Sequence, residues 1–107
     1  MLGLQAIEFI QNQTIVKIKL GDVSTIIYNN YNKEIGKDKM KDYLKRFLSI
    51  IDNWNQEYVD NQFIDGIDWK LILVYDQRIK EYKGYGRTPS NFPLLQELFY
   101  SMIESEK

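Results

Sequence analysis

The sequence of 107 residues contains neither cysteine nor histidine. These two absences exclude a disulfide scaffold, a Cys/His zinc site and a nucleophile activated by histidine. Acid–base chemistry would therefore depend on carboxylates, lysines or tyrosines with shifted pKa values. No recognisable catalytic motif supplies such a set, so we expect a non-enzymatic protein without a metal or another cofactor.

An excess of charge of one sign is also absent, since 14 lysines and arginines stand against 15 acidic residues for a formal net charge of -1. A general nucleic-acid binder usually has a marked basic excess, although a local basic face is compatible with these numbers. No stretch approaches the length of a membrane span, about 18 apolar residues, and the first residues do not resemble a signal peptide. Because the lack of cysteine also fits a reducing compartment, we expect a soluble cytoplasmic protein without a membrane partner.

Hydrophobic residues are nevertheless plentiful, at 44% of the chain, and 14% of residues are aromatic. This amount supports one folded core, and the length fits a single α+β domain over residues 1–107. β-Branched and alternating residues predict strands over 4–10, 14–20 and 24–28, joined by short polar turns. Residues 29–36 are polar and are expected to form a turn.

A long amphipathic helix is predicted from Asp38 to about Asp60, because apolar residues recur there every three or four positions. The apolar stripe consists of Met40, Tyr43, Leu44, Phe47, Ile51, Trp54 and Tyr58. The polar residues that follow Asp60 are expected to end the helix.

The second half of the chain predicts a hairpin and a second helix. Residues 67–75 alternate between apolar and polar, and a short turn leads to a strand over 79–83. Two glycines and a proline make 84–89 a loop, after which Ser90 or Asn91 is expected to cap the helix. The core face of that helix holds Leu95, Leu98, Phe99, Met102 and Ile103.

The element order β-β-β-α-β-β-α predicts a two-layer α+β fold, with an antiparallel meander sheet and both helices on one face. The other face would present Lys17, Lys19 and Lys70 beside Ile72 and Val74. A second subunit could cover this partly apolar face, so a homodimer is an open alternative.

Basic residues gather around the start of the long helix and acidic residues follow them. Local ion pairs on a solvated helix face explain this pattern without any function. The functional interpretation is that the basic end steers a charged partner, and positive charge near a helix start opposes the macrodipole, which favours function slightly. The residues predicted to bind a partner here are Lys37, Lys41, Lys45 and Arg46, with Lys33 and Lys39 close in sequence.

Tyrosine and arginine are enriched at the centres of protein interfaces. Tyr82, Tyr85 and Arg87 lie close in sequence and are predicted to form a contact patch. Tyr31, beside several asparagines, is predicted to form a second one.

Two weaker motifs have ordinary explanations. The carboxylates Asp60, Asp65 and Asp68 surround the predicted helix-to-strand turn, but their spacing does not match a calcium loop, and turn chemistry explains Asp65. The Gly-x-Gly at 84–86 lacks the lysine and the third glycine of nucleotide-binding loops. We therefore predict neither a metal site nor a phosphate loop.

One motif in the second half resembles a known pattern. It consists of Asp65-Gly66-x-x-Trp69, an alternating strand, Gly84 or Gly86, and then Pro89-x-Asn91-Phe92-x-x-Leu95. The pattern is similar to that of small uncharacterised α+β proteins of low-GC bacteria and their phages, and it implies a hairpin-plus-helix module without a transferable function. The small size and the Asn-, Ile-, Lys- and Tyr-rich composition also resemble anti-CRISPR and other anti-defence inhibitors of phages and mobile elements.

Three functions follow from these observations. The first is a non-catalytic inhibitor that binds a larger protein or ribonucleoprotein complex in the host cytoplasm, such as a CRISPR nuclease. The second is a nucleic-acid-binding module that uses the basic start of the long helix. The third is a small-ligand-binding domain, or a metal-assisted enzyme built on Asp60, Asp65 and Asp68.

Overall fold

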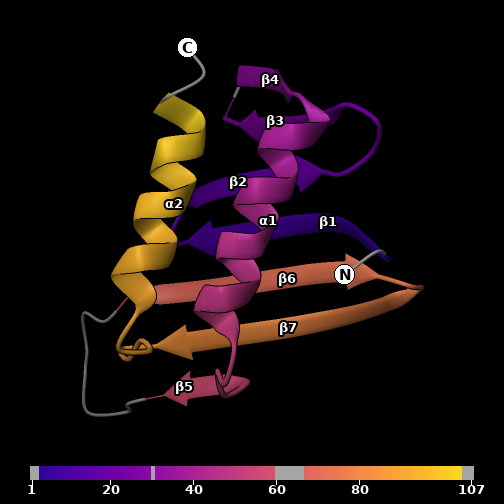
Figure 1. The fold of residues 1–107 in the computed structure, drawn as a ribbon. Helices are drawn as coiled ribbons and strands as arrows, with labels where there is room; N and C mark the ends of the chain where they lie inside the picture. The colour runs from indigo at the N-terminus through magenta and orange to yellow at the C-terminus, as the bar shows by residue number, and fades with distance from the viewer. Residues whose placement is uncertain (1–2, 30, 60–66, 105–107) are drawn as a thin grey trace.

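The computed structural model describes residues 3–29, 31–59 and 67–104, and it shows a seven-stranded sheet with two helices packed side by side on one face (Figure 1). The elements, in chain order, are β1 (Leu4–Gln11), β2 (Thr14–Lys19), β3 (Ser24–Tyr28), β4 (Tyr31–Ile35), α1 (Lys37–Ile51), β5 (Glu57–Val59), β6 (Asp68–Tyr75), β7 (Arg78–Tyr85) and α2 (Phe92–Glu104). The predicted α+β class with two helices on one face is thus confirmed.

The strands lie in the order β4-β3-β2-β1-β6-β7-β5. The first four strands form an antiparallel meander, and β6 then returns to pair with β1 at the centre of the sheet. The last neighbours, β5 and β7, are parallel, so the sheet is not the purely antiparallel one that we expected. Because β5 and β7 do not follow one another along the chain, no hairpin turn forces them to run antiparallel.

The order of elements also differs from the predicted one, because β4 and β5 were not expected. Residues 31–35 were expected to belong to a polar turn, but Lys33 and Ile35 point to the helices and are buried, whereas Glu34 between them is exposed. Asn29, with a φ of 54°, adopts the left-handed conformation that a tight turn between β3 and β4 requires. The alternation of β4 was therefore hidden by its polar residues.

The long helix is shorter than predicted, since α1 ends at Ile51. Asn53, with a φ of 68°, has left-handed backbone geometry that cannot continue a right-handed helix. Trp54 nevertheless packs on the core, with its ring centroid 5.7 Å from that of Trp69. The apolar stripe thus continues in space beyond the end of the helix. Helical spacing alone placed Trp54 and Tyr58 in α1, which was wrong.

Aromatic rings fill the core between the sheet and the helices. Phe9 of β1 stacks on Phe99 of α2 with ring centroids 4.7 Å apart. The ring centroids of Trp69 and Phe92 are 4.9 Å apart. Gly84 is needed beside Trp69, because a Cβ there would overlap the indole ring. These contacts fix α2 against the central strands.

Asn91 directly precedes α2, where a cap was predicted, and its side chain joins the two helices. Its Oδ1 accepts a hydrogen bond from Trp54 Nε1 at 2.8 Å, and its Nδ2 donates to the Ile50 carbonyl at 2.7 Å. The end of α1 and the start of α2 are therefore held together by one amide.

Candidate binding site

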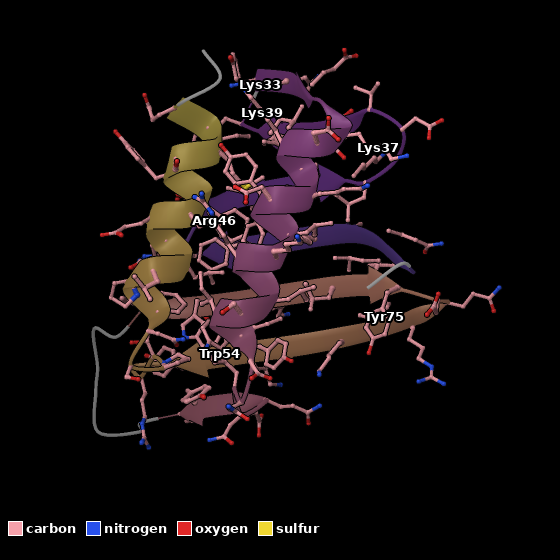
Figure 2. All side chains as sticks on the ribbon, viewed as in Figure 1. Lys33, Lys37, Lys39, Arg46, Trp54 and Tyr75 are labelled. Atoms are coloured by element: carbon pink, nitrogen blue, oxygen red, sulfur yellow. The ribbon has the colours of Figure 1, made fainter. Side chains whose placement is uncertain are left out.

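The basic start of α1 divides into side chains that lie on different sides of the helix. Lys37, Lys41 and Lys45 are four residues apart, and this spacing places them in one row. Arg46 lies toward α2, beside a cavity between the two helices that Lys45 also borders. Arg46 Nη2 forms an exposed ion pair with Asp42 Oδ2 at 3.1 Å (Figure 2). The structure thus brings together three of the four predicted residues, which we call the lysine row.

The lysine row is exposed and forms no ion pair with any residue in the described ranges. Lys33 is different, because it points inward from β4 and is only 9% exposed. The start of the helix has no side-chain cap at Gly36, and Asp38 is the acidic residue of its first turn. A lysine at position 37 therefore adds positive charge to the positive end of the helix dipole, where a carboxylate would stabilise the helix.

The lysine row borders a cavity of about 470 Å³ between α1 and the sheet. Sequence reasoning missed this cavity, because it depends on how far the sheet extends beyond the helix. Its floor and walls are mainly aliphatic, so the positive charges surround an apolar interior. The residues that line it are Leu4, Leu20, Gly21, Ser24, Lys37, Met40, Lys41, Leu44 and Lys45.

A second cavity of about 370 Å³ lies near the end of α1, above β6 and β7. Trp54, Tyr75 and Tyr82 contribute aromatic walls, and Lys80 contributes a cation. A hydrogen bond with the Tyr82 hydroxyl, followed by the electrostatic influence of Tyr82, raises the pKa of Lys80 above its ordinary value. The Lys80 Nζ also lies 5.4 Å from the centroid of the Tyr82 ring, within the range of a cation–π interaction.

The predicted patch of Tyr82, Tyr85 and Arg87 does not form as one surface. Tyr82 is 3% exposed and packs edge-on against Trp54, with ring centroids 5.9 Å apart. Tyr85, in contrast, is 41% exposed. Both belong to β7, and residues three apart in a strand point to opposite faces of a sheet. Tyr85 and Arg87 therefore remain candidates for partner contacts, and Tyr82 belongs to the core.

Tyr31 is 41% exposed and lies on β4, at one edge of the sheet. Tyr85 lies on β7, next to β5 at the opposite edge. The two predicted aromatic sites are thus far apart and cannot form a single patch. Neither is among the residues that line the cavity beside the lysine row.

Of the three carboxylates that were considered for a metal, Asp68 is exposed on β6, while Asp60 and Asp65 lie outside the described residues. Within residues 3–29, 31–59 and 67–104, no group of three or more His, Cys, Asp or Glu side chains is placed to hold a metal ion. Over the same ranges, neither helix has the length and apolar character needed to cross a membrane.

Comparisons with protein-family models, with curated proteins and with solved structures found no match to this chain. Its function must therefore be argued from the geometry of its own surface.

Proposed function

We propose that this protein is a non-catalytic binding protein, and that the lysine row contacts an acidic surface of a protein partner. The observation that supports this most directly is a row of three lysines that form no ion pair with a described residue and that border an apolar cavity. Like charges on one side of a helix repel one another and do not stabilise it. An acidic partner would relieve this repulsion and could bury an apolar side chain at the same time.

A nucleic acid is the second candidate, because phosphates also bind lysines. The cavity favours a protein, since Leu4, Leu20 and Leu44 offer an apolar surface that phosphate groups cannot fill. Among the described residues that line this cavity none is aromatic, so the site offers no ring on which bases could stack.

We extend the proposal to an inhibitor that blocks a larger protein or ribonucleoprotein complex of bacterial defence, encoded by a phage or a mobile element. Its support is the composition and the small size of the chain together with a binding surface that needs no catalytic group. An interaction experiment would identify the target.

The test is an affinity pull-down of the tagged full chain from a nuclease-treated lysate of a low-GC bacterium that carries defence systems. A variant with Lys37→Gln, Lys41→Gln and Lys45→Gln is compared with a matched control with Lys17→Gln, Lys19→Gln and Lys70→Gln, which changes the uncovered face of the sheet. We expect a stoichiometric protein partner that the wild type and the control retain and the lysine-row variant loses.

Equal recovery by both variants would overturn the role of the lysine row. Recovery of nucleic acid alone from an untreated lysate, lost steeply as salt is raised, would replace the proposal by nucleic-acid binding. A defence nuclease among the retained proteins would support the inhibitor, and a different partner would exclude it.

A further inference from the structure

We propose that the two cavities beside α1 are parts of one groove, and that this groove binds an acidic amphipathic helix of the partner. This inference rests on the proposed function and adds the form of the partner segment. We call the surface the α1 groove; its principal residues are Leu4, Leu20, Leu44, Leu48, Tyr75 and Lys80.

The continuity of the groove follows from its lining. Leu4 borders both cavities, so the floor is shared. Along α1, Lys41, Leu44 and Lys45 border the first cavity, and Leu48 one turn later borders the second. Figure 2 shows Lys37 and Tyr75, at the two ends of this side of α1, both on the side away from α2.

The groove exists because the two helices do not cover the whole inner face of the sheet. Leu4, Leu20 and Tyr75 are only partly buried, although they pack against the core. The 15 residues of α1 correspond to about 22 Å of helix. A partner helix of about four turns beside α1 would cover this strip and add a third helix to the layer.

The charged side chains around the α1 groove determine which kind of partner helix would fit it. The lysine row lies along one wall, and Lys80 adds a positive charge at the far end. Asp52, which also borders the second cavity, is the one acidic side chain among the described residues that line the two cavities. A helix with leucine-like residues on one face and glutamates beside them therefore complements the groove.

A second copy of this chain is a less suitable occupant. Its exposed α2 residues include Leu94, Tyr100 and Glu97, which have some of the required chemistry. Docking α2 of one copy in the α1 groove of the next would be heterologous, however, and such contacts produce open chains unless the rotation closes a ring. A different protein is therefore the occupant to which we commit.

The experiment selects peptides from a displayed library of random sequences of about 16 residues, long enough for four turns. The immobilised full chain is the bait, and the enriched peptides are sequenced and measured by fluorescence anisotropy. We expect apolar residues at i, i+3 or i+4, and i+7, an excess of Asp and Glu, and induced helicity in circular dichroism.

Two variants and one control test whether these peptides bind in the α1 groove. Leu44→Glu with Leu48→Glu puts charge into the groove wall and should weaken binding by at least about tenfold. The control Leu94→Glu, on α2, should change it by less than about twofold. Lys80→Gln alters only an exposed charge, leaves the core intact, and should weaken binding by about threefold.

The groove is overturned if no peptide is enriched, if the enriched peptides lack helical periodicity, or if the groove variant binds them as the wild type does. Peptides that depend on the lysine row but not on Leu44 and Leu48 would leave the proposed function standing without the groove. Conversely, groove-dependent peptides together with a pull-down that recovers no protein would support the groove and overturn the proposed function. Enrichment of sequences that match α2 would replace the foreign partner by a second copy, which light scattering would confirm.

Discussion

The two faces of the sheet differ in whether their charged side chains have partners of opposite sign within the chain. On the uncovered face, charges of opposite sign are neighbours. Lys70 Nζ lies 3.9 Å from Glu81 Oε1, and Lys83 Nζ lies 3.5 Å from Glu57 Oε1. In the α1 groove, on the other face, three lysines line one wall without an ion pair to any described residue. Charges that are paired within the chain need no partner to account for them. Charges of one sign around an apolar cavity are better explained by an oppositely charged partner.

The uncovered face is also apolar in places. Ile79 is 71% exposed and Ile15 is 42% exposed, and Ile72 and Val74 are half-buried. Charged residues alternate with these side chains across the strands, as where Glu81 pairs with Ile72. Such interruptions are a common protection against unwanted association of sheets. A homodimer through this face remains a prediction that light scattering can test.

The largest expected difference between the faces concerns two tyrosines of β7. Tyr82→Ala should lower the free energy of unfolding by about 3–5 kcal/mol, because it removes a buried ring that packs against Trp54. Tyr85→Ala, on the other face, should lower it by about 1 kcal/mol or less. Urea denaturation followed by circular dichroism measures both values. Similar losses for the two variants would contradict the assignment of the tyrosines to opposite faces.

These two tyrosines also show what the sequence could and could not predict. The strand before Gly84 was expected to end at Lys83, so Tyr85 was assigned to a loop and grouped with Tyr82. In the structure β7 continues to Tyr85, and strict alternation along a strand then separates the two residues. The glycines that suggested a loop instead serve packing, since Gly84 makes room for Trp69.

Regular apolar patterns were sufficient for most of the remaining elements. The strands β1, β2, β3 and β6 and the core faces of both helices were predictable, because hydrophobic periodicity depends only on local sequence. Neither β5, which is three residues long, nor its parallel pairing with β7 could be predicted, because both depend on contacts distant in sequence. The lysine row could be read from its four-residue spacing, but the cavity beside it depends on the relative widths of the sheet and the helix layer.

A smaller effect, opposite in sign on the two faces, is expected from reversing single charges. Lys37→Glu places a carboxylate at the positive end of α1 and one turn before Lys41, so it should stabilise the protein by about 0.3–1 kcal/mol. Lys17→Glu faces Glu8 across the β1–β2 pair and should destabilise it by about 0.2–1 kcal/mol. Denaturation at low ionic strength measures both, and the neutral variants with Gln should lie between. Destabilisation by Lys37→Glu would show that the lysine row contributes to stability and is not reserved for a partner.

The smallest expected effect concerns Lys80, whose hydrogen bond with Tyr82 raises its pKa above the ordinary 10.5. A lysine with a raised pKa contributes stability that is fully present below the ordinary pKa and is lost as the pH rises through the raised value. Tyr82→Phe should return the Lys80 pKa toward 10.5, as followed by the side-chain NMR signals during a pH titration. Because Lys80 is exposed, the accompanying loss of stability should stay below about 1 kcal/mol at neutral pH. An unchanged pKa would mean that the hydroxyl does not hold this ammonium group, and the far end of the α1 groove would then lack a positioned cation.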